Sequence, residues 1–408
     1  MKNCRHCHNP LKHSFLDLGS APPSNALLSP EQLFQPEIYY PLRGMVCENC
    51  WLVQTEDYAT AEDLFQDNYP YFSSASSTWL THARSFSNYI IDNLRLDEES
   101  MVIEVASNDG YLLRNFVEAG IPCLGIEPTN GTADAAERLG IPVLREFFTE
   151  SIGIQLRSEG RQADLIIGNN VYAHVPDIND FTLGLKAVLK QSGTISLEFP
   201  HLLHLIENCQ FDTIYHEHFS YLSLHAISNI FEESGLRILD VEEIPTHGGS
   251  LRVYGCHGVD ERESKKSVDN VLEEEKRGGI LDLQSYLNFQ AKAEEIKNGL
   301  LTFLLEQKAK GKKVAAYGAA AKGNTLLNFA GVKNDLIPFA FDAAPSKQGK
   351  FMPGSHIPIL SPDKLEEIQP DYVLILPWNI CGEVKKQLSF IGDWGGQFVT
   401  TVPDLTIS

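Results

Sequence analysis

The sequence predicts an α/β protein with two doubly wound sheets of parallel strands, preceded by a small metal-binding domain. Three features predict this architecture: two cysteine pairs near the N-terminus, alternating strand and helix patterns from residue 101 to residue 170, and a second strand–turn–helix unit that begins at residue 312. A chain of 408 residues is also too long for one ordinary hydrophobic core.

The charge of the chain makes some partners unfavourable. The formal net charge of −21 disfavours nucleic acid and anionic membranes as partners, whereas a small nucleotide ligand is compatible with one locally positive pocket. No uncharged apolar run is long enough to span a bilayer, and the N-terminal residues lack the apolar core of a secretory signal. We therefore expect a cytoplasmic protein whose cysteines do not form disulfides.

Four cysteines predict a zinc site in the N-terminal domain. Cys4 with Cys7, and Cys47 with Cys50, are two Cys-x-x-Cys pairs of identical spacing, which suits a tetrahedral ion. A site closed by four thiolates has no open position for water, so we expect the zinc to be structural. Three neighbouring histidines are the alternative ligands: His6, His8 and His13.

The central region predicts a ligand site at the carboxyl ends of parallel strands. An apolar strand at 101–105 leads into a tight polar turn, a second strand at 123–126 ends at Glu127, and a third at 163–168 ends at Asn169. Ligands of such sheets bind where the strand order reverses. A carboxylate at Glu127 suits the two hydroxyls of a ribose. The predicted cofactor-binding residues are Glu104, Ala106, Ser107, Asn108, Gly110, Glu127 and Asn169.

The turn after the first strand favours S-adenosylmethionine over a nicotinamide dinucleotide. Ala106 and Asn108 stand where methyltransferases commonly have glycine, and only Gly110 remains. A pyrophosphate needs the close backbone approach that a G-x-G-x-x-G turn allows. S-adenosylmethionine has no phosphate and so tolerates fewer glycines. For Glu104 the alternative interpretation is a solvated strand residue.

A block rich in titratable side chains follows, from Tyr215 to Tyr221. In an extended chain Tyr215 and Glu217 would face one way and His216 and His218 the other, whereas at a helix start Tyr215 and His218 would share a face. Either arrangement gathers groups that can move protons near neutral pH. Two alternatives remain: a metal site at the two histidines, and satisfied polar residues of the core.

The last third predicts a helical linker followed by a Rossmann-like domain. Residues 260–311 carry leucines at helical spacing, and a strand, a small-residue turn and a helix start follow at 312–325. Further strands are expected at 337–342 and near 372–378. We expect Lys322, with Asn324, to hold the diphosphate of a nucleotide at this turn. The alternative is a scaffold that binds nothing.

Six blocks of the sequence, in order along nearly the whole chain, resemble the sugar C-methyltransferases of deoxysugar pathways. They are the two cysteine pairs and the segments 102–110, 215–221 (YHEHFSY), 246–252 (THGGSLR) and 317–324 (YGAAAKGN). The resemblance implies a zinc-binding domain at 1–75, a methyltransferase domain at 76–258, a linker at 259–311 and a nucleotide-sugar-binding domain at 312–408. It also implies a dTDP- or other NDP-linked 4-keto-deoxysugar as the substrate, methylated at C3.

The resemblance further implies roles for individual residues. His218 would be the general base, flanked by Tyr215 and Glu217, with Tyr215 holding the enolate oxygen. His174 is a second polar group near the reacting carbon, and Tyr69 would close over the ligands. Further candidates for binding the substrate are Tyr71, His247 and Arg252.

The chemistry of carbon methylation agrees with this set of residues. A proton beside a carbonyl can be removed, and the enolate that results attacks the sulfonium methyl, so a base and a hydrogen-bond donor to the oxyanion are needed. Three other functions stay open at this stage: an NAD-dependent oxidoreductase, an O- or N-methyltransferase of another small molecule, and a non-catalytic adaptor that uses the zinc domain.

Overall fold

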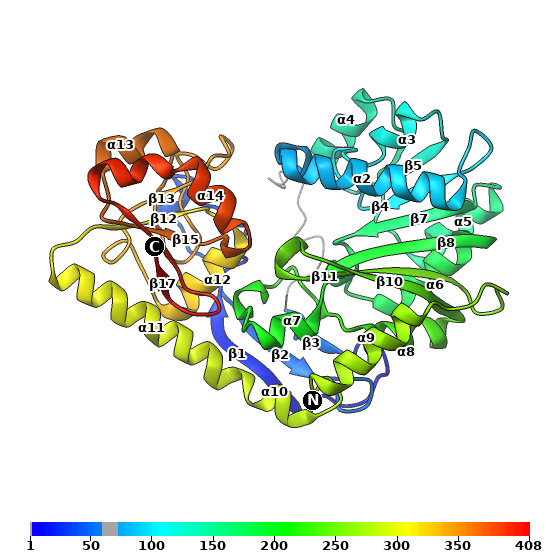
Figure 1. Ribbon diagram of the computed structural model, residues 1–408, viewed down its shortest axis with the longest axis horizontal. Coiled ribbons are helices and arrows are strands. Elements are labelled where there is room, and N and C mark those ends of the chain that lie inside the picture. The colour runs from blue at the N-terminus through cyan, green and yellow to red at the C-terminus, as the bar shows by residue number, and fades with distance from the viewer. Residues whose placement is uncertain (1, 59–71) are drawn as a thin grey trace.

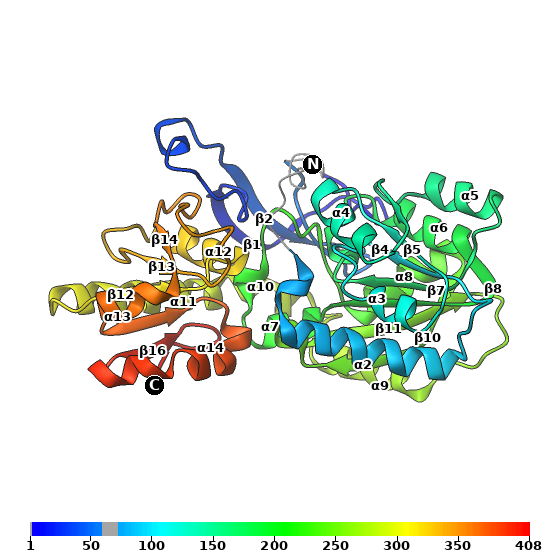
Figure 2. The same ribbon diagram turned by 90° about the horizontal axis from the view of Figure 1, so that it is seen from above.

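A computed structural model describes residues 2–58 and 72–408 and builds them around three sheets (Figure 1). A four-stranded sheet near the N-terminus lies between a seven-stranded central sheet and a six-stranded C-terminal sheet (Figure 2). Helices cover the two larger sheets, so the predicted α/β class is confirmed. Among the described residues, no helix is long and apolar enough to cross a membrane.

The N-terminal sheet takes one strand from the middle of the chain. Its order is β1-β2-β3-β9, and all its pairs are antiparallel. The strands are β1 (His13–Ala21), β2 (Tyr40–Val46), β3 (Val53–Thr55) and β9 (Ser220–Tyr221). Because β9 is the end of the histidine-rich block, the pairing of Val53 with Tyr221 brings that block to the edge of the metal-binding domain.

The central sheet has the order β10-β11-β8-β7-β4-β5-β6. Its strands are β4 (Val102–Val105), β5 (Cys123–Ile126), β6 (Val143–Leu144), β7 (Ala163–Asn169), β8 (Leu189–Pro200), β10 (Leu236–Ile244) and β11 (Ser250–His257). The run from β8 to β6 is parallel, and the order reverses between β4 and β7, which makes their carboxyl ends the expected ligand site. The β10–β11 hairpin adds two antiparallel strands at one edge.

Helices pack on both faces of the central sheet because its buried strands are apolar on both sides. Val102 and Leu165 pack with α2 on one face, and Ile103 and Ile166 pack with α6 and α8 on the other. The helices of this region are α2 (Ser77–Leu94), α3 (Arg114–Glu118), α4 (Asn130–Arg138), α5 (Glu150–Ser158), α6 (Ile178–Val188), α7 (Leu202–Glu207) and α8 (Leu224–Ser234).

Three helices form the predicted connection to the C-terminal sheet: α9 (Lys266–Arg277), α10 (Leu283–Leu287) and α11 (Phe289–Ala309). Helix α11 runs along the lower edge of the molecule in Figure 1 and reaches β1, where the rings of Phe15 and Phe289 stack with centroids 4.4 Å apart. The linker therefore packs as part of the core.

The C-terminal sheet repeats the winding of the central one. Its order is β14-β13-β12-β15-β16-β17, parallel except for β17. Its elements are β12 (Val314–Tyr317), α12 (Ala321–Ala330), β13 (Ala340–Phe341), β14 (Ile359–Leu360), α13 (Leu365–Ile368), β15 (Tyr372–Ile375), α14 (Cys381–Gln387), β16 (Gln397–Thr400) and β17 (Thr406–Ile407). The strand expected at 337–342 is shorter than predicted, since only two of its residues pair. The order reverses between β12 and β15, next to Lys322.

Candidate active site

The four predicted zinc ligands lie together in the N-terminal domain. The sulfur atoms of Cys4, Cys7, Cys47 and Cys50 all lie within 4.8 Å of one another. The Cys4–Cys50 and Cys7–Cys47 sulfur pairs are 3.6 and 3.5 Å apart, close to the roughly 3.8 Å expected for four thiolates around one zinc ion. The donor set and its spacing fit a tetrahedral zinc site.

The two cysteine knuckles share one backbone geometry. The amide of His8 donates to the carbonyl of Cys4 at 3.0 Å, and the amide of Trp51 donates to that of Cys47 at 2.9 Å. Both residues have a left-handed backbone with φ of 60°. The identical spacing seen in the sequence thus reflects two copies of the same turn.

The three alternative histidine ligands lie outside this cluster. Nδ1 of His6 bonds Asn179 at 2.9 Å, and Nε2 of His13 bonds Glu48 at 2.8 Å. The group of residues suited to a metal, within the part of the chain that the structure describes, contains cysteines alone. The same observation leaves the metal interpretation of His216 and His218 without support.

The turn after β4 explains the missing glycines. Ala106, Asn108 and Gly110 all have left-handed backbones, with φ of 57°, 51° and 76°. The chain thus adopts the glycine-type turn although two of its three positions carry side chains, which costs about 1–2 kcal/mol at alanine. The amide of Asn108 donates to Oε2 of Glu127 at 3.0 Å, which joins the turn to the end of β5.

Acidic and unsatisfied polar groups gather at the carboxyl ends of β4 and β7. Glu104 is 1% exposed, so its interpretation as a solvated residue is wrong. Burial raises the pKa of Glu104 well above its usual range, and the nearby charges of Asp109 and Glu127 raise it further. Among the described residues, several buried polar atoms here lack a hydrogen-bond partner: Glu104 Oε2, Ser107 Oγ, Asp109 Oδ1 and both amide atoms of Asn169. Such a site fits a polar, positively charged ligand, as S-adenosylmethionine is.

Tyr215 and His218 form a hydrogen-bonded pair. Residues 215–218 are neither extended nor helical but form a turn, in which the amide of His218 donates to the carbonyl of Tyr215 at 2.9 Å. The Tyr215 hydroxyl lies 2.8 Å from Nε2 of His218, and Nδ1 of the same ring lies 2.9 Å from the carbonyl oxygen of Thr213. Since that carbonyl only accepts, Nδ1 carries the proton and Nε2 is free to take one.

Other titratable groups surround this pair. The rings of His174 and His218 meet edge to face with centroids 4.6 Å apart. Burial lowers the pKa of His218 well below 6.5, and the neighbouring His174, Lys322 and His247 lower it further. Burial likewise lowers the pKa of His174 and of His247 to about 4. These histidines are therefore neutral at pH 7.

Lys322 reaches this group from the C-terminal domain. Its Nζ lies 3.0 Å from Oδ1 of Asn379 and 4.4 Å above the ring of Trp378. Burial lowers its pKa to about 8, against the attraction of Asp212. Trp378 Nε1 donates to Asp212 Oδ2 at 2.8 Å, which joins the two larger domains beside the site.

Two predicted site residues bond the N-terminal segment. Both carboxylate oxygens of Glu217 accept from Nδ2 of Asn25, at 2.8 and 2.9 Å. Nδ2 of the Asn324 side chain donates to the carbonyl of Ser24 at 2.6 Å. In this arrangement they connect domains, and their roles in catalysis and in substrate binding stay predictions.

Arg252, which was predicted to bind the substrate, is buried and bonds other side chains of the protein. Its guanidinium bonds Glu198 at 2.8 Å, and that fully buried carboxylate also bonds His82 at 3.0 Å and the Thr246 hydroxyl at 3.1 Å. His247 is next along the chain and has its ring 5.5 Å from that of Trp79. The network thus supports the segment that carries His247.

Sequence reasoning missed five residues beside the site: Trp79, His82, Glu198, Asp212 and Trp378. Two of them had a usable signal, since Glu198 lies near the carboxyl end of β8 and Trp378 follows β15, where ligands of such sheets bind. Tyr69 and Tyr71 lie outside the described residues, and their predicted roles are untested.

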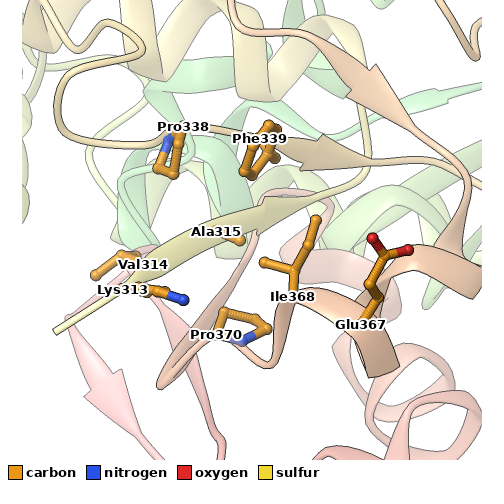
Figure 3. A pocket seen from close by; sticks show the side chains of 8 residues that line it. All are labelled: Lys313, Val314, Ala315, Pro338, Phe339, Glu367, Ile368 and Pro370. Carbon is orange, nitrogen blue, oxygen red and sulfur yellow. The ribbon is translucent and has the colours of Figure 1, made fainter.

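A separate apolar cavity lies at the amino ends of the C-terminal strands, away from Lys322. It has a volume of about 300 Å³ and lies at the amino ends of β12 and β15 (Figure 3). Its lining includes Val314, Phe339 and Ile368. Lys322 lies at the other end of β12, so this cavity is distinct from the group around His218.

Comparison with known proteins agrees with this geometry. Residues 245–403 match the C-methyltransferase C-terminal domain family, residues 4–65 a zinc-binding domain family and residues 80–241 a methyltransferase domain family. The chain is 33% identical over 401 residues to C-methyltransferase NovU of Streptomyces niveus. The alignment covers 98% of this chain and 95% of that protein.

Solved structures match only part of the chain. An S-adenosylmethionine-dependent methyltransferase from Clostridium acetobutylicum aligns with a TM-score of 0.36 and 11% identity, over 44% of this chain and 92% of that one. Magnesium protoporphyrin IX methyltransferase from Synechocystis aligns with a TM-score of 0.35 and 14% identity, over 44% and 83%.

The family matches assign methyl transfer to carbon, so the oxidoreductase, the O- or N-methyltransferase and the adaptor are not supported. With its thiolate cluster and its acidic cofactor turn, the chain belongs to the C-methyltransferase family and is an S-adenosylmethionine-dependent enzyme with a zinc-binding domain.

Proposed function

We propose that the enzyme methylates the carbon beside the keto group, C3, of a nucleotide-linked 4-keto-deoxysugar. The observation that carries this proposal is the meeting of a Tyr215–His218 pair, two further neutral histidines and Lys322 where the central and C-terminal domains touch. A base beside a cation suits a substrate that has both an acidic carbon and a diphosphate. The resemblance of the motifs to deoxysugar enzymes supports the sugar as the rest of the substrate.

His218 acts as the base in this proposal. Its Nε2 carries a lone pair because Nδ1 donates to the Thr213 carbonyl, and its lowered pKa keeps the ring neutral at pH 7. The proton leaves the carbon beside the carbonyl and moves to Nε2, and the negative charge passes to the carbonyl oxygen. The Tyr215 hydroxyl donates to that oxygen once it turns from Nε2.

We infer that Glu104, Asn108, Glu127 and Asn169, at the carboxyl ends of the central strands, would hold the cofactor. When bound, S-adenosylmethionine supplies an electrophilic methyl group. Polar atoms of Glu104 and Asn169 have no hydrogen-bond partner among the described residues. They would bond the charged amino-acid part of the cofactor. Glu127 would exchange its bond with the Asn108 amide for the ribose hydroxyls.

Lys322 holds the diphosphate in this scheme. Its partners in the structure are a neutral amide and an aromatic face, and Asp212 keeps its carboxylate on Trp378. An anion can therefore approach the ammonium without displacing an ion pair. We place the reaction in the cytoplasm, because nucleotide sugars are found there and its reducing conditions keep cysteine thiols available for zinc.

Two experiments test the function. Incubation with methyl-labelled S-adenosylmethionine and a dTDP-4-keto-deoxysugar should add one methyl group, and carbon NMR should place the label at C3. Without the cofactor, the enzyme in D₂O should exchange the proton at the same carbon, and His218→Asn should abolish that exchange. Label on oxygen, or exchange that persists in His218→Asn, would contradict the proposal.

A further inference from the structure

The first zinc knuckle contacts both segments that carry the active-site histidines. Arg5 lies between the ligands Cys4 and Cys7, and its side chain is only 7% exposed although it is charged. Its Nη1 donates to the carbonyl of Pro176 at 2.6 Å, two residues after His174. Its guanidinium also lies 5.4 Å from the ring of Phe219, the residue after His218.

Strand β3 makes the second connection. Nη2 of Arg5 donates to the Thr55 carbonyl at 3.0 Å, and the Thr55 hydroxyl in turn donates to the carbonyl oxygen of His218 at 3.0 Å. The Thr55 amide donates to the carbonyl of Phe219 at 3.1 Å. Thr55 therefore links the Arg5 side chain to the backbone of His218 through two successive hydrogen bonds.

The two histidine segments also bond each other at this point. The amide of Phe219 donates to the carbonyl of Ala173 at 2.8 Å. This bond lies between residues adjacent to His218 and His174, whose rings are 4.6 Å apart. Arg5 therefore contacts both segments close to the bond that joins them.

The cysteine cluster holds the backbone of Arg5 in place. Its backbone amide donates to Oε1 of Gln54 at 2.9 Å, and Nε2 of the same side chain donates to the sulfur of Cys4 at 3.2 Å. Gln54 is 1% exposed, so water does not compete for these bonds. The Cys4 ligand, the Arg5 backbone and β3 therefore form one hydrogen-bonded unit.

We propose that Arg5 is a positioning residue for methyl transfer, and that zinc, by ordering the first knuckle, keeps His174 and His218 at their working separation. The zinc domain then sets the geometry of the base from a distance. This inference rests on the proposed function, because it takes these two histidines to act on the substrate. Catalytic geometry tolerates little error, and a misplacement of about 1 Å can cost roughly 100-fold in rate.

The test compares Arg5→Met and Arg5→Lys with Lys12→Met, which removes an exposed cation of the same domain from its pair with Glu48. Zinc per chain, the Kd of S-adenosylmethionine, kcat and KM are measured for each. We expect Arg5→Met to keep its zinc and cofactor affinity but to lose about 10- to 100-fold in kcat. Arg5→Lys should recover part of that loss, and Lys12→Met should match the wild type.

Hydrogen exchange of the wild-type enzyme, without any substitution, gives a readout independent of activity. Removal of zinc with a chelator should speed exchange in segments 172–177 and 215–222 and leave β7 protected. The inference would be overturned if Arg5→Met with full zinc had the wild-type kcat, or if its kcat fell only in proportion to the zinc that it had lost. Unchanged exchange in both segments after zinc removal would also overturn it. Full activity of His218→Asn would instead overturn the proposed function, whatever the exchange shows.

Discussion

The hydroxyl of Tyr215 lies 2.8 Å from Nε2 of His218, the one ring nitrogen of that residue that has no proton. The phenol therefore donates to the imidazole in the absence of substrate. A sugar that displaces this hydrogen bond would expose the lone pair of Nε2 and release the hydroxyl at the same time. In the proposed mechanism, one movement would then prepare both the base and the donor to the enolate oxygen.

The first prediction concerns this pair. His218→Asn should lower kcat by about 10²–10⁴, because it removes the proton acceptor, and Tyr215→Phe should lower kcat by less, because the base remains. Steady-state rates and calorimetric binding of S-adenosylmethionine check both variants. His225→Asn, on α8, is the matched control and should turn over normally. An unchanged kcat in His218→Asn would remove the base assignment.

The second prediction concerns activity at low pH. A base works in its neutral form, and the pKa of His218 is lowered well below 6.5 by burial and by the neighbouring His174, Lys322 and His247. The acid limb of kcat/KM should therefore lie below pH 6.5, and activity should fall only as the pH drops through that lowered pKa. A profile in D₂O and H₂O from pH 4 to 9 measures it. A midpoint above 6.5 would mean that another group acts as the base.

The third prediction concerns Lys322 at high pH. Its pKa is lowered to about 8, so the ammonium loses its charge as the pH rises through that value. KM for the nucleotide sugar should rise above pH 8 while kcat changes little. Lys322→Gln should raise KM about 10- to 150-fold at pH 7 and lose this pH dependence, since a charged hydrogen bond contributes about 1.5–3 kcal/mol. A KM that is flat to pH 9.5 in the wild type would contradict the role.

The fourth prediction compares two glycines of similar backbone. Gly110 and Gly120 have φ of 76° and 74°, but a Cβ at Gly110 would meet Ile141 Cδ1 at 2.4 Å, whereas nothing lies within 4 Å at Gly120. Gly120→Ala should cost about 1 kcal/mol of unfolding free energy from backbone strain alone. Gly110→Ala should cost about 1–3 kcal/mol more from crowding. Urea unfolding measures both, and equal losses would show that the cofactor turn is loosely packed.

The fifth prediction concerns the metal. Cys50→Ser should reduce bound zinc below one ion per chain and lower the free energy of unfolding by more than about 2 kcal/mol, because a buried ligand is lost. Cys381→Ser, at a half-buried cysteine outside the thiolate cluster, should leave the bound zinc unchanged and lower the free energy of unfolding by less than Cys50→Ser does. Metal analysis and thermal unfolding provide the measurements. A Cys50→Ser protein with full zinc would mean that another residue completes the site.

Much of the architecture was predictable because it is encoded locally. The spacing of the cysteine pairs, the strand–turn–helix unit around Gly110 and the one around Lys322 each occupy a short segment, so periodicity and turn residues suffice to find them. The histidine block could not be placed in this way. Its turn is stabilised by the Thr213 carbonyl, the Thr55 hydroxyl and strand β3, which lie outside the pattern of the block itself.

The contacts that join the domains were beyond any local pattern. Asp212 meets Trp378 across 166 positions, and Asn25 meets Glu217 across 192. Such pairs depend on how whole sheets pack, and many residue types could have filled either position.

The sequence by itself determined which chemical groups this protein has: four cysteine thiols, an acidic turn after a parallel strand, and the imidazole, phenol and ammonium groups for which we propose roles on the substrate. Only the tertiary structure decided that the histidines and Tyr215 of the central region lie near Lys322 of the C-terminal domain, and that Arg5 of the zinc knuckle contacts both histidine segments. The physical reason is that side-chain identity is a property of one position, whereas a distance of a few ångströms between remote positions is set by the packing of all the elements between them.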